Sequence, residues 1–180
     1  MRFLETPLAG AYSIEIEPHV DDRGFFARVW AQDELTAQGL DPRATQANIG
    51  FSARAGTLRG LHYQAEPFSE VKIVRCTAGR IFDVIVDLRV SSPTHRRWFG
   101  IELSAENRRA LYVPESFAHG YLTLTDAAEI LYLTSAPYQP SHARGVRHDD
   151  PAFGIKWPTP IEIISDADRG WPEYVYGPQA

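Results

Sequence analysis

The amino-acid sequence predicts an all-β protein, a double-sheet jelly roll (a double-stranded β-helix) with a few short helices. From Thr57 onward, short runs rich in Val, Ile, Phe and Tyr are separated by Gly, Pro, Asn and Asp, a pattern typical of strands and turns in a sandwich or barrel. Helix signals are sparse by comparison. No internal repeat, low-complexity tract or charge block marks a linker, so we expect one domain over residues 1–180.

The clearest strand is expected at residues 80–89, where the side chains alternate between two faces. One face would carry Phe82, Val84, Val86 and Leu88, and the other Ile81, Asp83, Ile85 and Asp87. We expect one of these two faces to pack inward. Further strands are predicted at residues 71–77, 98–103, 110–113, 120–124 and 129–134.

Helical and irregular structure is expected in two other segments. Residues 31–38, with the sequence AQDELTAQ, form the clearest helix candidate, and Gly39 follows as the C-terminal stop. The Pro-rich tail after Pro158 is expected to follow the surface as irregular structure.

Composition and charge restrict the class of protein. The 180 residues are 44% hydrophobic and 23% charged, which indicates a folded globular protein. The formal net charge of -5 argues against a nucleic-acid-binding or membrane-surface protein, because such proteins usually carry a basic excess. Cys76 is the single cysteine, and the N-terminus lacks the basic segment and long apolar run of a secretory signal. We therefore expect a cytoplasmic protein.

Two segments with a histidine bear on the question of a metal. The spacing of GTLRGLHYQ, which contains His62, resembles the first motif of the cupins, and VPESFAHG supplies His119. Metal-binding cupins place another histidine two positions after the first, so that both imidazoles project from one strand face, but here that position is Gln64. We therefore expect no metal and no other cofactor, although Glu66 or Glu70 could complete a ligand set.

A longer series of segments covers nearly the whole chain. They are DDRGFFARVW from Asp21, TQANIGFS from Thr45, GTLRGLHYQ from Gly56, VKIVRCTAGRIFDVIVDLR from Val71, YVPESFAHGYLTL from Tyr112, EILYLTSAPY from Glu129, RGVRHDDPAFGIKWP from Arg144 and ISDAD from Ile164. Their order and spacing resemble the dTDP-4-dehydrorhamnose 3,5-epimerase family. The resemblance implies a cupin-like jelly roll, usually a homodimer, that works without a cofactor on a nucleotide-linked sugar. The expected reaction is epimerisation of a 4-keto-6-deoxyhexose at C3 and C5, from dTDP-4-dehydro-6-deoxyglucose to dTDP-4-dehydrorhamnose.

The resemblance also assigns catalytic roles that fit this chemistry. A ketone at C4 acidifies the C–H bonds at C3 and C5, so epimerisation requires a base, a group that stabilises the enolate oxygen, and an acid on the opposite face. His62 matches the family's base, and Asp168 matches the carboxylate that fixes its tautomer, with Asp166 as the near alternative. Lys72 matches the lysine that faces the C4 oxygen, and we expect it to be partly buried. Tyr132 matches the general acid.

The remaining matched positions would bind the substrate. They are Arg23, Phe26, Gln46, Asn48, Arg59, His119 and Tyr138. The resemblance implies that Tyr138 stacks on the nucleotide base and that Arg59 and Arg23 contact the pyrophosphate. It also implies that N-terminal segments cross between the subunits of the dimer, so that Arg23 would serve the neighbouring site.

Several alternatives stay open on the sequence alone. Arg28, Ala143 and Ala167 replace residues that are glutamate, glutamate and lysine in many relatives, so a CDP- or GDP-linked sugar is an alternative substrate. Inversion at C3 alone is an alternative reaction, whereas Lys72 and Tyr132 disfavour a 3,4-ketoisomerase. A non-catalytic sugar-binding cupin and a metal-dependent cupin oxygenase or isomerase are alternatives from other classes. A lone histidine or tyrosine in such strands is more often structural, and the co-occurrence of all the matched residues is what favours the epimerase.

Overall fold

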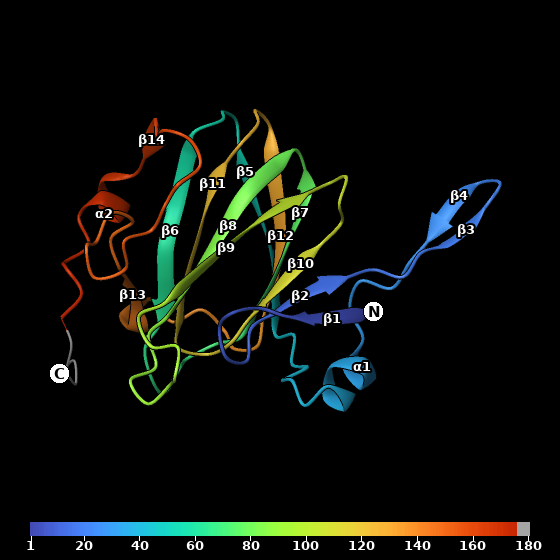
Figure 1. Ribbon diagram of the computed structural model, residues 1–180, viewed down its shortest axis with the longest axis horizontal. Coiled ribbons are helices and arrows are strands. Elements are labelled where there is room, and N and C mark those ends of the chain that lie inside the picture. Colours follow the sequence, from blue (N-terminus) through green and yellow to red (C-terminus); the bar gives the residue numbers. More distant parts are fainter. Residues whose placement is uncertain (176–180) are drawn as a thin grey trace.

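Residues 1–175 are described by a computed structural model, in which two sheets face one another (Figure 1). The first sheet has the order β1 (Arg2–Glu5), β2 (Tyr12–Glu15), β10 (Ala110–Val113), β7 (Lys72–Ala78), β12 (Ala128–Thr134) and β5 (Gln46–Ser52). The second has the order β13 (Ala143–Gly145), β6 (Thr57–Gln64), β11 (Phe117–Thr123), β8 (Arg80–Asp87) and β9 (Trp98–Ser104), with β14 (Ile163–Ile164) in parallel beside β6. This architecture confirms the all-β jelly roll.

Helical structure is short and peripheral. Within the described residues it comprises α1 (Gln32–Ala37), a 3-10 turn (Pro140–His142) and α2 (Asp166–Arg169). The helix expected at residues 31–38 is therefore confirmed as α1. Neither α-helix in this part of the chain has the length and apolar character needed to cross a bilayer. The hairpin of β3 (His19–Asp21) and β4 (Gly24–Phe26) extends away from the two sheets, at the right of Figure 1.

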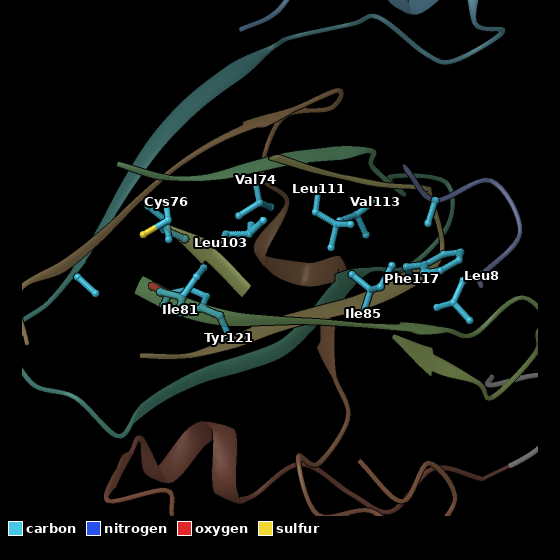
Figure 2. Packing of buried hydrophobic residues seen from close by; sticks show 13 residues of the cluster. Leu8, Val74, Cys76, Ile81, Ile85, Leu103, Leu111, Val113, Phe117 and Tyr121 are labelled. Carbon is cyan, nitrogen blue, oxygen red and sulfur yellow. The ribbon is translucent and has the colours of Figure 1, made fainter. Parts of the chain in front are cut away.

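The main hydrophobic core fills the space between the two sheets (Figure 2). Val74 and Leu111 enter it from the first sheet, and Ile81, Ile85 and Leu103 enter it from the second. All five side chains are almost completely buried, because alternate positions of each strand point to the same face. This packing fixes the register of the strands that carry the pocket described below.

One face of residues 80–89 packs inward as predicted, but the opposite face, which was not expected to be covered, is buried too. Ile81 and Ile85 lie in the core between the sheets, but Val84 and Val86 on the opposite face are also fully buried. The reason is that the chain after β13 covers the outer face of the second sheet, where Phe153 packs against the same cluster. On the first sheet, α1 covers the outer face in a comparable way through its buried Leu35.

The tail after Pro158 is more regular than expected. It contributes β14, which pairs with β6, and α2, whose first turn is capped by the Ser165 hydroxyl accepting a hydrogen bond from Asp168 N–H (3.0 Å). A two-residue strand and a single helical turn leave almost no periodicity in the sequence, so pattern analysis does not detect them. Both elements matter here because they bring Asp168 to β6.

A close approach between β6 and β11 positions two histidines. Gly60 has a φ of +119°, and a Cβ atom there would lie 2.6 Å from the Cα of Gly120. The register shifts at this point, so that His62 lies opposite His119 whereas Arg59 lies opposite Tyr121. Residues directly opposite one another in an antiparallel pair share a face, so both imidazoles project into the same space.

Candidate active site

A pocket of about 970 Å³ lies between the two sheets and the C-terminal segment. Nine of the eleven residues predicted for the site line it, and they come from β5, β6, β7, β11, β12, the loop after β12 and α2. These nine are Gln46, Asn48, Arg59, His62, Lys72, His119, Tyr132, Tyr138 and Asp168. The fold therefore gathers residues that are far apart in the sequence into one cavity.

His62 and Asp168 form a hydrogen-bonded pair. The His62 Nε2 atom lies 2.5 Å from Asp168 Oδ1, and the backbone N–H of Gly60 donates to Asp168 Oδ2 at 3.2 Å. Burial disfavours the ionised carboxyl, but the hydrogen bonds from His62 and Gly60 outweigh it and lower the pKa of Asp168. Asp166 is exposed in the same helical turn, so the structure brings Asp168 and not Asp166 to the histidine.

Lys72 reaches the pocket from β7 and is buried, more deeply than the partial burial that was expected. Its Nζ atom lies 3.3 Å from Glu70 Oε1 and donates to the backbone carbonyl of His62 at 3.3 Å. Burial lowers the pKa of the Lys72 ammonium, and the nearby carboxylates of Glu70 and Asp83 partly offset this effect. Lys72 is therefore shielded from water next to the base candidate, with its Nζ atom against the Glu70 carboxylate.

Tyr132 enters the pocket from β12 on the same face as Ile130 and Thr134, as the strand alternation predicts. It lies opposite Asn48 of β5. Partial burial raises the pKa of the Tyr132 phenol, and the negative charge of Glu70 raises it further. The side chain is consequently a neutral proton donor at physiological pH.

A second histidine–carboxylate pair lies beside the first. His119 Nε2 is 2.8 Å from Asp83 Oδ1, and Asp83 is completely buried. Asp83 was not predicted as a site residue, although one signal was available, since an acidic residue at an inward-facing strand position is costly unless it has a partner. The partner here is the matched His119.

The polar rim of the pocket is held by hydrogen bonds that join β5 to β6 and to the loop after β12. The Gln46 side-chain oxygen accepts a hydrogen bond from Tyr138 N–H at 2.6 Å, and the Tyr138 ring is 62% exposed at the mouth, where it is free to stack on a ligand. The Arg59 guanidinium donates to Ser52 Oγ (3.1 Å) and to the carbonyl of Phe51 (2.9 Å). Both hydrogen bonds tie the Arg59 guanidinium to β5 and hold it at the pocket wall.

Two predicted residues lie outside this pocket. Arg23 and Phe26 belong to the β3–β4 hairpin, which points away from the sheets (Figure 1). Arg23 forms an ion pair with Asp21, and the Phe26 side chain is 73% exposed. Within one chain, therefore, the hairpin contributes nothing to the pocket.

Other lining residues were not predicted. Trp171 approaches the His62 ring, and Arg144 lies at the wall next to Ala143. The C-terminal segment that carries Trp171 gave no strand or helix signal that would have directed attention to it. Gln64 is buried, and its amide oxygen accepts from Gln139 N–H at 2.6 Å, so it acts as a structural link. Among residues 1–175, no group of three or more His, Cys, Asp or Glu side chains is placed to hold a metal ion.

Comparisons of the sequence and of the structure with known proteins agree with one another. The family model described as dTDP-4-dehydrorhamnose 3,5-epimerase matches residues 5–175. A dTDP-4-dehydrorhamnose 3,5-epimerase of Sinorhizobium fredii is 43% identical, over 96% of this chain and 89% of that protein. A crystal structure of the Bacillus anthracis dTDP-4-dehydrorhamnose 3,5-epimerase with TDP and PPi bound has a TM-score of 0.92 and 40% identity, over 96% of this chain and 99% of that one. A dTDP-4-dehydrorhamnose 3-epimerase of Streptomyces niveus is 38% identical, over 94% of this chain and 82% of that protein.

Proposed function

This chain belongs to the dTDP-4-dehydrorhamnose 3,5-epimerase family, and we propose that the pocket between its sheets is the active site. The chain is accordingly an isomerase that epimerises a dTDP-linked 4-keto-6-deoxyhexose at C3 and C5. The observation that carries the proposed mechanism is that one pocket contains a paired histidine and carboxylate, a buried lysine and a partly buried tyrosine. These are the groups that proton transfer beside a ketone requires.

His62 acts as the base in this mechanism. Because Nε2 is engaged by the ionised Asp168, the neutral ring carries its proton on Nε2 and presents its lone pair on Nδ1. Nδ1 takes the proton from C3 or C5, and the electron pair of the broken C–H bond forms the enolate with its charge on the C4 oxygen. The imidazolium that results is stabilised by Asp168.

Lys72 and Tyr132 complete the reaction. The Lys72 ammonium stabilises the enolate oxygen more than the neutral ketone, and its burial strengthens this interaction. Tyr132 donates its phenolic proton to the carbon from the face opposite His62, which inverts the centre. Exchange with solvent then returns a proton to Tyr132 and removes one from His62, so the net reaction moves no proton permanently.

Substrate binding uses the rim of the pocket. Tyr138 stacks on the nucleotide base, and Gln46 holds the backbone at that position. Arg59 contacts the pyrophosphate, for which a guanidinium group is well suited. Asn48 and His119 contact the sugar side of the substrate from β5 and β11.

The remaining two predicted residues act in a homodimer. Arg23 and Phe26 lie on a hairpin that extends beyond its own subunit, so they would reach the pocket of a second copy. The apolar exposure of this hairpin supports the proposal, since Val20 is 76% and Phe26 73% exposed. The outer face of β5 also exposes Ile49 and Phe51, at 67% and 54%. The cytoplasmic location stays a prediction.

Product analysis tests the reaction and its substrate. Purified protein would be incubated separately with the dTDP-, CDP- and GDP-linked forms of the 4-keto-6-deoxyglucose, and the configuration at C3 and C5 followed by proton NMR coupling constants. We expect inversion at both carbons with the dTDP form. Inversion at C3 alone would favour the 3-epimerase activity named for the Streptomyces niveus relative, and inversion only with CDP or GDP would contradict the assigned substrate.

A further inference from the structure

Trp171 lies in the pocket wall against the ring of His62. The two ring centroids are 6.3 Å apart with an interplanar angle of 70°, which is an edge-on contact. The His62 side chain is 46% exposed, so packing within β6 does not by itself fix the orientation of the imidazole. A neighbour that limits the tilt of this ring therefore helps to set the direction in which its base nitrogen points.

The indole of Trp171 is seated on a glycine. Gly145 of β13 lies directly opposite His62 of β6, so a side chain at position 145 would project on the same face as the imidazole. A Cβ atom at Gly145 would lie 2.2 Å from Trp171 Cε2 and 2.4 Å from Trp171 Nε1. Only glycine leaves room for the indole there. The Trp171 Nε1 atom is buried without a hydrogen-bond partner among residues 1–175, so shape rather than hydrogen bonding holds the ring.

The same short segment delivers Asp168 and Trp171 to His62. Asp168 belongs to α2, whose N-terminus is capped by Ser165, and Trp171 follows three residues later. The carboxylate restrains the Nε2 edge of the imidazole, and the indole restrains the ring from the side of β13. Two contacts from one anchored segment leave the ring far less freedom than the hydrogen bond alone.

We propose that Trp171, seated on Gly145, is a positioning residue that keeps the His62 imidazole aimed at the substrate. This proposal rests on the assignment of His62 as the base. The physical reason is that proton transfer from carbon needs the base nitrogen in line with the C–H bond, and displacement by about 1 Å can cost roughly a hundredfold in rate. The effect should therefore fall on turnover and not on substrate binding.

The test uses both sides of the contact. Trp171→Ala and Gly145→Ala should each lower kcat by roughly 10- to 100-fold with little change in KM. Trp171→Phe, which keeps a flat ring, should recover most of the turnover. Because the two residues act through one contact, Gly145→Ala should have almost no further effect in the Trp171→Ala background.

Tyr174→Ala is the matched control. Tyr174 packs against Phe153, at 5.1 Å between ring centroids, and anchors the same C-terminal segment without lining the pocket. It should leave kcat close to the wild-type value. An equal loss in this variant would mean that loosening of the segment explains the result, and would overturn the proposal.

Other outcomes separate this proposal from the proposed function. Unchanged kcat in both Trp171→Ala and Gly145→Ala, or a loss confined to KM, would overturn the positioning role while leaving His62 as the base. If His62→Ala retained wild-type turnover, the assignment of the base would fail, and the positioning role would fail with it.

Discussion

At the scale of single residues, the hydrogen bond between Asp168 and His62 favours one tautomer of the histidine ring. Burial opposes its ionisation, but the hydrogen bonds from His62 and Gly60 lower its pKa, so the carboxylate is charged at neutral pH. Asp168→Asn would present an amide that can donate to Nε2, which favours the tautomer that carries its proton on the intended base nitrogen. We expect kcat to fall by about a thousandfold or more while KM changes little, as measured by steady-state kinetics.

Asp166→Asn provides the control for this substitution. Asp166 lies in the same helical turn but is exposed, so the same change of charge should leave kcat near the wild-type value. A comparable loss in both variants would argue that the charge of the segment matters rather than the contact with His62.

We predict that Glu70 affects the alkaline limit of activity. Its carboxylate raises the pKa of Lys72 against the lowering effect of burial, and it also adds to the raised pKa of Tyr132. Glu70→Gln removes both effects, so the ammonium and the phenol would each lose a proton at lower pH. The alkaline limb of the kcat–pH profile should therefore move to lower pH. An unchanged or upward-shifted limb would show that neither group limits turnover at high pH.

The residues that form the site could be predicted from the sequence, but many of the contacts between them could not. His62, Lys72 and Tyr132 follow from matched motifs, and the structure brings them into one pocket. The partnership of His119 with Asp83 was missed because it depends on the pairing of β11 with β8, which no local pattern specifies. Trp171 was missed for the same reason, since its contact with His62 joins segments more than a hundred residues apart in the chain.

At the scale of the elements, β6 is constrained by the close approach of its Gly60 to Gly120 of β11. Gly60→Ala would place a Cβ 2.6 Å from backbone on a strand with positive φ. We expect the free energy of unfolding to fall by roughly 2–4 kcal/mol, as measured by urea denaturation. The pairing of His62 with His119 would be disturbed at the same time, with loss of turnover.

Gly39→Ala separates the free-energy cost of a side chain at positive φ from the cost of overlap with neighbouring atoms. Gly39 also has positive φ, +76°, but nothing lies within 4 Å of the position of its Cβ. This variant should lose only about 1 kcal/mol. Equal losses in the two variants would contradict the close approach of β6 and β11 as the cause.

The strand predictions succeeded where a single strand carries a recognisable pattern of apolar residues. Residues 110–113 and 98–103 alternate or form short apolar runs, and they correspond to β10 and β9. Both faces of β8 are buried because residues after β13 cover the second sheet, which is a tertiary effect with no signature inside β8. The strands before Thr57 were not predicted, and two of them, β3 and β4, are only three residues long.

At the scale of the whole molecule, a dimer would make each site depend on two chains. We infer that residues 1–180 form one domain and that its hairpin completes the pocket of a second copy. His62→Ala and Arg23→Ala chains should each be impaired alone. When they are mixed and refolded together, heterodimers would hold one intact site, and about a quarter of wild-type activity should return. A mixture no more active than the average of its components would contradict the shared site, and light scattering would report the oligomeric state.

The most direct test of His62 as the base and Tyr132 as the acid is proton NMR of dTDP-4-dehydro-6-deoxyglucose with the enzyme in D₂O. We predict that the wild type exchanges and inverts both centres, and that Tyr132→Phe still exchanges a proton for deuterium but forms little inverted product. His62→Asn should do neither, while its circular dichroism spectrum stays that of the folded protein. Exchange at the wild-type rate in His62→Asn would contradict the assignment of the base.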